Sequence, residues 1–150
     1  TLGLVSPKVP IVIPKVDDCI TLLLGSTEER KKQLKIEPGT YFLTRGYIGE
    51  TGDFILPGIS EIKNKYDKDT LQWVVKEMLK NYRKIAFIDT GNYNSSEYKE
   101  KARQEAVKLG LKFEEIKGSN KILDKIVNKN WNGQFIIIRP GARITSDMFD

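Results

Sequence analysis

The chain's only cysteine follows two carboxylates, as Asp17, Asp18 and Cys19, and the three residues lie between two apolar runs. The first run ends at Pro14 and the second stops at Gly25. We expect a strand followed by a short helix, with Cys19 in the first helical turn. The positive end of a helix favours a thiolate, which is both a nucleophile and a metal ligand. We therefore predict that these three residues form the reactive side of a site, with Cys19 also a candidate metal ligand.

Each of the three residues also has a purely structural interpretation. A lone cysteine is often a small buried hydrophobic residue, and an aspartate before a helix is often its N-cap. We favour the cap for Asp18 and expect Asp17 to point into a cleft. Capping and function can coexist at these neighbouring positions. For Cys19 both interpretations stay open, because its place at a strand end beside the acid pair also favours a functional thiol.

Apolar runs and amphipathic segments alternate along the rest of the chain. The apolar runs predict strands over residues 9–13, 40–44, 84–88, 111–116 and 135–138. The three- and four-residue spacings predict helices over residues 18–24, from 26 onwards, 69–82, 94–109 and 122–127. This alternation favours an α/β fold, with a three-layer, mostly parallel (Rossmann-like) sheet covered by helices on both faces. We expect a single α/β domain over residues 1–150. Since the chain begins at Thr1 without Met, we hypothesise that it is the C-terminal part of a longer protein.

In parallel sheets, ligands bind where the strands' carboxyl ends lead into loops. The predicted loops cover residues 15–19, 45–49, 89–93, 118–120 and 139–143, and in a fully parallel sheet all five lie along one edge. The residues we predict to bind a ligand there are Lys15, Thr44, Arg45, Asp89, Thr90, Gly91 and Arg139, with Arg143 as a further arginine. Arginine suits bidentate anion binding. Asp-x-Gly is also an ordinary turn sequence, and arginines are common on surfaces, so these interpretations stay open.

Composition excludes several classes of function. The chain has no histidine, so it cannot supply a Ser-His-Asp triad or a histidine-based metal site. Its net charge of +5 comes from 25 basic and 20 acidic residues that are mixed along the chain, and this mixing argues against a nucleic-acid-binding role. No apolar stretch reaches the roughly 20 residues that span a membrane. A single cysteine fits a reducing cytoplasm, where we expect the protein to be.

Two segments carry a family resemblance: "VPIVIPKVDDCITLLLGSTEER" at residues 9–30 and "EPGTYFLTRGYI" at residues 37–48. They resemble the domain-of-unknown-function family numbered sixteen thirty-eight. Its pattern is an apolar strand, a basic residue, His-Asp-Cys-Ile-Thr, a leucine run, Gly-Ser, and then Pro-Gly-Thr-Tyr. Family members are often encoded beside corrinoid-dependent methyltransferases in anaerobic bacteria and methanogenic archaea. The resemblance therefore implies a role near one-carbon or methyl-group metabolism, with no established activity.

The chain departs from the family pattern at its candidate metal ligands. Asp17 stands where the family has histidine, and Val5 stands where an upstream cysteine is usual. Three cysteines would suit an iron–sulfur cluster with one open iron, but this chain has Cys19 alone. Any other cluster ligands would lie outside this chain. A corrinoid and an iron–sulfur cluster are the two cofactors that the resemblance implies.

Three functional hypotheses follow. The leading one is a cytoplasmic protein that binds a small anionic metabolite or cofactor at the strand ends, linked to corrinoid or one-carbon metabolism. The second is a non-catalytic accessory domain that serves a corrinoid protein or methyltransferase, and the third is a degenerate iron–sulfur protein. The residues do not decide whether the protein is an enzyme, and they are compatible with a homo-oligomer.

Overall fold

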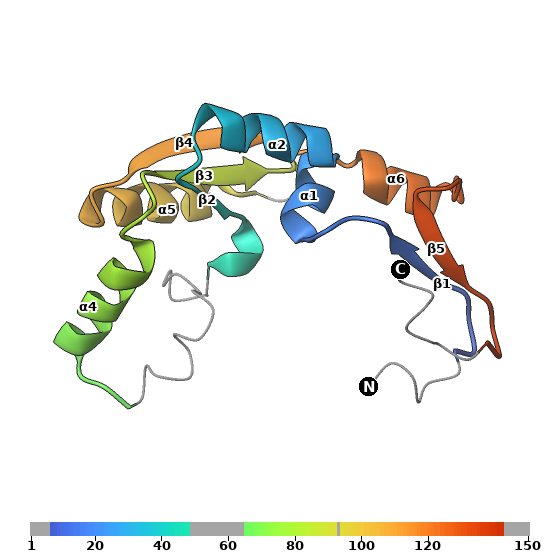
Figure 1. Ribbon diagram of the computed structural model, residues 1–150, viewed down its shortest axis with the longest axis horizontal. Helices are drawn as coiled ribbons and strands as arrows, with labels where there is room; N and C mark the ends of the chain where they lie inside the picture. The colour runs from blue at the N-terminus through green and yellow to red at the C-terminus, as the bar shows by residue number, and fades with distance from the viewer. Residues whose placement is uncertain (1–6, 49–64, 93, 143–150) are drawn as a thin grey trace. The chain divides into compact units, whose positions relative to one another are not determined.

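The structure, a computed structural model, describes residues 7–48, 65–92 and 94–142 of the 150-residue chain (Figure 1). The chain forms two compact units. The central unit is Glu28–Gly118, and the terminal unit combines Thr1–Thr27 with Ser119–Asp150. Three residues of the predicted loops lie outside the described residues, namely Gly49, Tyr93 and Arg143. The part of the expected glycine-rich loop that follows Gly49 lies outside them as well.

The central unit is built on a parallel sheet of three strands in the order β2-β3-β4. These strands are β2 (Thr40–Leu43), β3 (Lys84–Asp89) and β4 (Lys112–Lys117). In the register, Leu43 lies opposite Phe87, and Asp89 lies opposite Lys117. The mixed α/β, Rossmann-like class predicted from the sequence is confirmed, and the three carboxyl ends share one edge.

Strand β3 lies at the centre of the sheet, and five of its six residues are buried. This burial matches its continuous apolar run, since a central parallel strand is covered on both faces. Helix α5 (Ser96–Lys108) follows β3 and packs on the core through Ala102 and Ala106, which are fully buried. Their small side chains let the helix lie close to the sheet. The predicted inner stripe of this helix is confirmed, because Tyr98 and Leu109 pack against the same cluster.

Three further elements of the central unit lie in its described residues. Helix α2 (Thr27–Ile36) begins directly after Ser26, where the sequence predicts a helix start. Helix α4 (Lys68–Leu79) begins slightly earlier than predicted, because the Asp67 carboxylate accepts hydrogen bonds from the backbone N–H groups of Asp69 and Thr70. The short 3₁₀ helix η2 (Arg45–Tyr47) follows β2.

The terminal unit contains β1 (Ile11–Pro14), α1 (Cys19–Leu24), α6 (Lys121–Val127) and β5 (Phe135–Ile138). The two strands lie where the sequence predicts them, but their pairing is different. They form a separate antiparallel pair, with Ile11 opposite Ile138 and Pro14 opposite Phe135. A short apolar run predicts that a strand is buried but carries no information on its partner or its direction, and this is why the pattern suggested one parallel sheet.

Helix α1 ends at Gly25, where two constraints require glycine. Its φ is 87°, in the left-handed region, and its backbone N–H caps the helix by donating to the carbonyls of Thr21 and Leu22. A Cβ at this position would lie 2.6 Å from the Ser119 Oγ atom. Ser119 is held there because its N–H donates to the Leu23 carbonyl at 2.8 Å. The leucine run and the segment that opens α6 are thus fastened together at Gly25.

Candidate functional site

The site begins where β2 and β3 end on the shared carboxyl edge of the parallel sheet. Thr44 follows β2 and caps η2, its Oγ1 atom accepting a hydrogen bond from Gly46 N–H at 3.2 Å. Asp89 is the last residue of β3, and Thr90 and Gly91 continue from it. The β4 end is tied to the same place, because Gly118 N–H donates to the Asp89 carbonyl at 2.7 Å.

The Asp89 carboxylate organises the turn after β3. Its Oδ1 atom accepts from Gly91 N–H at 2.9 Å, and Gly91 has a left-handed φ of 74°. Its Oδ2 atom accepts from the buried Ser95 hydroxyl at 3.0 Å and pairs with Lys99 Nζ at 2.6 Å. The turn interpretation of Asp-x-Gly is therefore confirmed. The carboxylate fastens the start of α5 to the end of β3.

Lys99 lies between two carboxylates, with its Nζ atom also 2.7 Å from Glu115. Its hydrogen bond, followed by that from Gly91 N–H, holds the pKa of Asp89 below the usual value for aspartate. The hydrogen bonds to Asp89 and Glu115 raise the pKa of Lys99. Both groups stay charged at neutral pH, so Asp89 is an anchor for the turn and is poorly suited to donate a proton.

Arg45 brings a cation to the amino end of α5. It is exposed, and its guanidinium carbon lies 5.0 Å from the centre of the Tyr98 ring, in the first turn of the helix. Lys101 Nζ lies 5.7 Å from the same ring. The first turn of a helix carries partial positive charge from its backbone N–H groups. Lys101 Nζ also pairs with the Glu97 carboxylate of the same turn at 2.7 Å, so its charge is compensated there. Arg45 and the helix start are therefore the features that make this part of the edge favourable for an anion.

The predicted reactive residues lie in the terminal unit. Cys19 is the first residue of α1, is exposed and is not in a disulfide. Asp18 is the N-cap, as predicted, and its Oδ1 atom accepts from Thr21 N–H at 2.8 Å. Asp17 is exposed.

The structure brings together five of the residues predicted to bind a ligand, namely Thr44, Arg45, Asp89, Thr90 and Gly91. It does not bring all five predicted loops to one sheet edge. Lys15 and Arg139 follow β1 and β5, and in an antiparallel pair the two carboxyl ends lie at opposite ends. The prediction of a single edge was therefore wrong for these two residues, and the loop with Asp17, Asp18 and Cys19 follows β1 as well.

Sequence reasoning missed the residues that complete the turn, which are Ser95, Tyr98, Lys99 and Glu115. A signal was present for two of them, because Ser95 and Lys99 are four residues apart and therefore lie on one face of a helix. That face follows directly after a strand ending in Asp89. Glu115 gave no signal, because only the β3–β4 register brings it near Lys99.

The described residues offer few ligands for a metal ion or an iron–sulfur cluster. No three His, Cys, Asp or Glu side chains gather in the described ranges in a way that could hold a metal ion. An iron–sulfur cluster takes several thiolates, and the chain has one cysteine. The residues present do not fit a cluster held by this chain alone.

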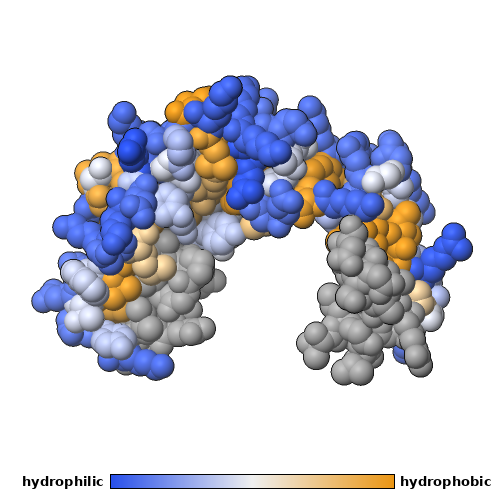
Figure 2. All heavy atoms as spheres, viewed as in Figure 1, coloured by the Kyte–Doolittle hydropathy of each residue, from blue (hydrophilic) through white to orange (hydrophobic). Residues whose placement is uncertain are grey.

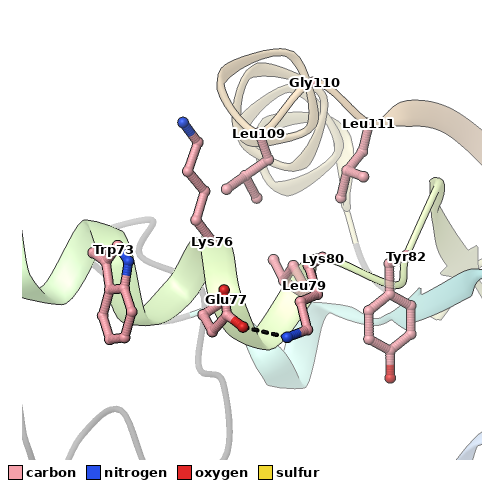
Figure 3. A pocket seen from close by; sticks show the side chains of 9 residues that line it. All are labelled: Trp73, Lys76, Glu77, Leu79, Lys80, Tyr82, Leu109, Gly110 and Leu111. Atoms are coloured by element: carbon pink, nitrogen blue, oxygen red, sulfur yellow. Dashed lines mark hydrogen bonds and ion pairs between the residues drawn. The ribbon is translucent and has the colours of Figure 1, made fainter.

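A hollow of about 440 Å³ lies at the opposite edge of the parallel sheet (Figure 3). Its walls come from the C-terminal half of α4 and from the segments that lead into β3 and β4. Trp73 and Lys76 line it from α4, and Leu109 and Leu111 line it from the end of α5 and the segment before β4. Trp73 is 65% exposed. None of the residues predicted from the sequence to bind a ligand lines this hollow.

Fold and site together define an α/β protein with a Rossmann-like parallel sheet and a polar, partly cationic carboxyl edge. A family model described as "Protein of unknown function (DUF1638)" matches residues 1–127, and the chain belongs to this family. The resemblance noted over residues 9–48 thus extends over most of the chain. Searches of curated proteins and of solved structures find no match. None of the helices in the described ranges has the length and apolar character that a bilayer crossing requires.

Proposed function

We propose that this protein binds a small anionic metabolite or cofactor at the carboxyl edge of its parallel sheet. The observation that carries the proposal is the position of Arg45, whose guanidinium lies 5.0 Å from the Tyr98 ring centre in the first turn of α5. A guanidinium can bind a carboxylate or phosphate in bidentate fashion. The adjacent helix start adds partial positive charge for the same anion.

The turn after β3 supports the proposal by leaving room for a ligand. Gly91 is exposed, and no heavy atom lies within 4 Å of the position that a Cβ would take. Asp89 holds this turn through Gly91 N–H and Ser95, so the backbone is fixed before a ligand arrives. Pre-ordered backbone lowers the entropy that binding must offset. Thr44, Arg45 and Thr90 are the side chains that we assign to ligand contact.

The family resemblance suggests the class of ligand to try first. We propose a link to corrinoid or one-carbon methyl metabolism, with a corrinoid protein or methyltransferase as partner. Corrinoids and folate-type carriers both bear anionic groups, and both belong in a thermal-shift screen beside inorganic phosphate. A ligand that binds the native state alone raises the unfolding temperature, and the shift grows with the logarithm of the ligand concentration above its Kd.

Arg45→Ala tests the site directly. We expect it to weaken binding of the ligand found in the screen by about 10- to 100-fold, because a charge-assisted hydrogen bond contributes roughly 1.5–3 kcal/mol. Arg103→Ala is the matched control, since Arg103 also stacks on an aromatic ring, 4.8 Å from the centre of Phe113. Isothermal titration calorimetry measures both. Equal losses in the two variants would contradict an Arg45 site.

Cys19→Ser is the second arm of the same titration. If the thiol belongs to the reactive side, this variant changes binding or activity, and an unchanged protein removes Cys19 from the proposal. A screen without any hit, together with capture of a methyltransferase, would instead support the accessory-domain hypothesis. The exposed Trp73 at the hollow beside α4 is the observation that favours this second candidate.

A further inference from the structure

The antiparallel pair β1–β5 has an outer edge on each of its two strands. Among the described residues, neither strand has a second partner. Two-stranded ribbons are marginally stable alone, and an outer edge presents unpaired backbone groups to any further strand. Figure 2 shows apolar residues gathered over β5, where Ile137 is 44% exposed.

The register shows which backbone groups face outward. Lys15 N–H donates to the Gln134 carbonyl at 2.8 Å, so these two residues form a hydrogen-bonded pair. Hydrogen-bonded and non-hydrogen-bonded pairs alternate in antiparallel ladders. The pairs Ile13–Ile136 and Ile11–Ile138 are then hydrogen-bonded as well. The pairs Val12–Ile137 and Pro14–Phe135 turn their backbone groups to the two outer edges.

Proline closes the outer edge of β1. Pro14 stands at an outward position and has no N–H to offer to a further strand. Pro10 precedes the strand by one residue and falls on the same side of the alternation. Only Val12 between them keeps an outward N–H. Prolines at such positions are a known protection of sheet edges against strand addition.

The outer edge of β5 has no such protection. Phe135 and Ile137 keep their outward N–H groups, and Arg139 follows on the same alternation. The one proline nearby, Pro140, falls on the inward-facing side. Within the part of the chain that the structure describes, the ribbon therefore has one edge closed by proline and one edge that can accept a strand.

We propose that the open edge of β5 pairs with β5 of a second copy of this chain, antiparallel and centred on Ile137. A two-fold axis there uses all three outward residues, because it places Ile137 opposite itself and Arg139 opposite the partner subunit's Phe135. The only charge in this stretch thus faces an aromatic ring and avoids the partner subunit's Arg139. The two copies would form a four-stranded sheet in the order β1-β5-β5-β1. Since proline closes the outer edge of β1 in each copy, no further strand can add, and the assembly is a closed dimer.

Two proline substitutions at one level of the ribbon test this proposal. Val12 and Ile137 are cross-strand partners, and both N–H groups face outward. Neither Val12→Pro nor Ile137→Pro removes a hydrogen bond within the ribbon. Sedimentation velocity of the full chain from about 1 to 100 μM should show a dimer for wild type and Val12→Pro, and at least a tenfold weaker association for Ile137→Pro.

Circular dichroism verifies that each variant folds. If either proline variant does not fold, Val12→Lys and Ile137→Lys are compared in place of the two proline variants. Two lysines facing each other at the two-fold axis would repel, so Ile137→Lys should also be monomeric. Amide exchange of Ile137 should slow as protein concentration rises. A wild type that stays monomeric at 100 μM would overturn the proposal. Equal weakening of self-association by the Val12 and Ile137 substitutions would also overturn it, as would binding of a different strand at this edge.

Discussion

Asp89 shows how one carboxylate can order a strand end. It accepts hydrogen bonds from Gly91 N–H and the Ser95 hydroxyl, and it pairs with Lys99, so three polar groups converge on two oxygen atoms. Its charge is stabilised in the folded state, which gives a pKa below that of a free aspartate. Residues of this kind position a site without touching its ligand.

The lowered pKa of Asp89 predicts a pH-dependent effect of Asp89→Asn. A depressed pKa means that the carboxylate stabilises the fold above the unfolded value of about 3.9, and that this stability is lost as pH falls through the folded pKa. We expect the variant to unfold at a lower urea concentration than wild type near neutral pH, with the difference closing as pH falls through the folded pKa of Asp89. Urea titrations near neutral pH and in acid measure it, with Asp124→Asn on α6 as the control. A gap independent of pH would contradict the ionic role.

Gly25 makes a second prediction at the same scale. Gly25→Ala forces a left-handed alanine and pushes a methyl group into Ser119, so its cost should exceed that of Gly110→Ala. Gly110 has a comparable φ of 69° and no atom near its Cβ position, so alanine there should cost about 1–2 kcal/mol. Chemical denaturation compares the two. Adding Ser119→Gly to Gly25→Ala should recover the steric part, and no recovery would contradict the clash.

At the scale of elements, the pairing of β3 with β4 buries the charged side chain of Lys84, a residue type that is usually exposed. The side chain of Lys84 at the start of β3 is 8% exposed, and its Nζ atom lies 2.6 Å from Glu114 on β4. The β3–β4 register brings the two together, since Lys84 lies opposite Lys112 and Glu114 lies opposite Ala86. A buried ammonium of this kind depends on its partner.

This dependence predicts that the two members of the pair respond differently to substitution. Glu114→Ala leaves Lys84 buried without its carboxylate and should cost about 1–3 kcal/mol of unfolding free energy. Lys84→Met replaces the buried charge with an apolar chain of similar length and should cost less, because the half-exposed Glu114 returns to water. Thermal or urea unfolding decides between them. Combining Lys84→Met with Glu114→Ala should restore part of the lost stability. A double variant no more stable than Glu114→Ala would contradict the claim that the unpaired Lys84 charge causes the loss.

The elements themselves were largely readable from the sequence. The continuous apolar run of β3 and the Ala102–Ala106 stripe of α5 are visible as patterns. Burial on both faces of a strand leaves an unbroken apolar run, and burial on one face of a helix leaves a period of three to four residues. Helix α4 starts earlier than its apolar pattern because the cap at Asp67 extends it. The outward-facing prolines of β1 acquire meaning only once the register with β5 is known.

At the scale of the whole molecule, the chain leaves the terminal unit after Thr27 and returns to it at Ser119. Strand β1 therefore pairs with residues more than 100 positions later in the chain, as Ile11 with Ile138 shows. Such distant pairing is costly in loop-closure entropy and slows folding. It also means that the family's most recognisable segment, residues 9–30, shares its unit with the end of the chain.

By itself, the sequence determined the α/β class, the strand and helix positions, the Asp18 cap and the family. All of these depend on local patterns within a few residues. Only the tertiary structure decided that Lys15 and Arg139 leave opposite ends of an antiparallel pair, that Ser95 and Lys99 contact Asp89, and that Glu115 pairs with Lys99. Strand partners and directions arise from contacts between distant residues, and local hydrophobic periods do not encode them. The residues predicted for the site accordingly lie together at the ends of β2 and β3, where the sheet is parallel, and lie apart at β1 and β5, where the pairing is antiparallel.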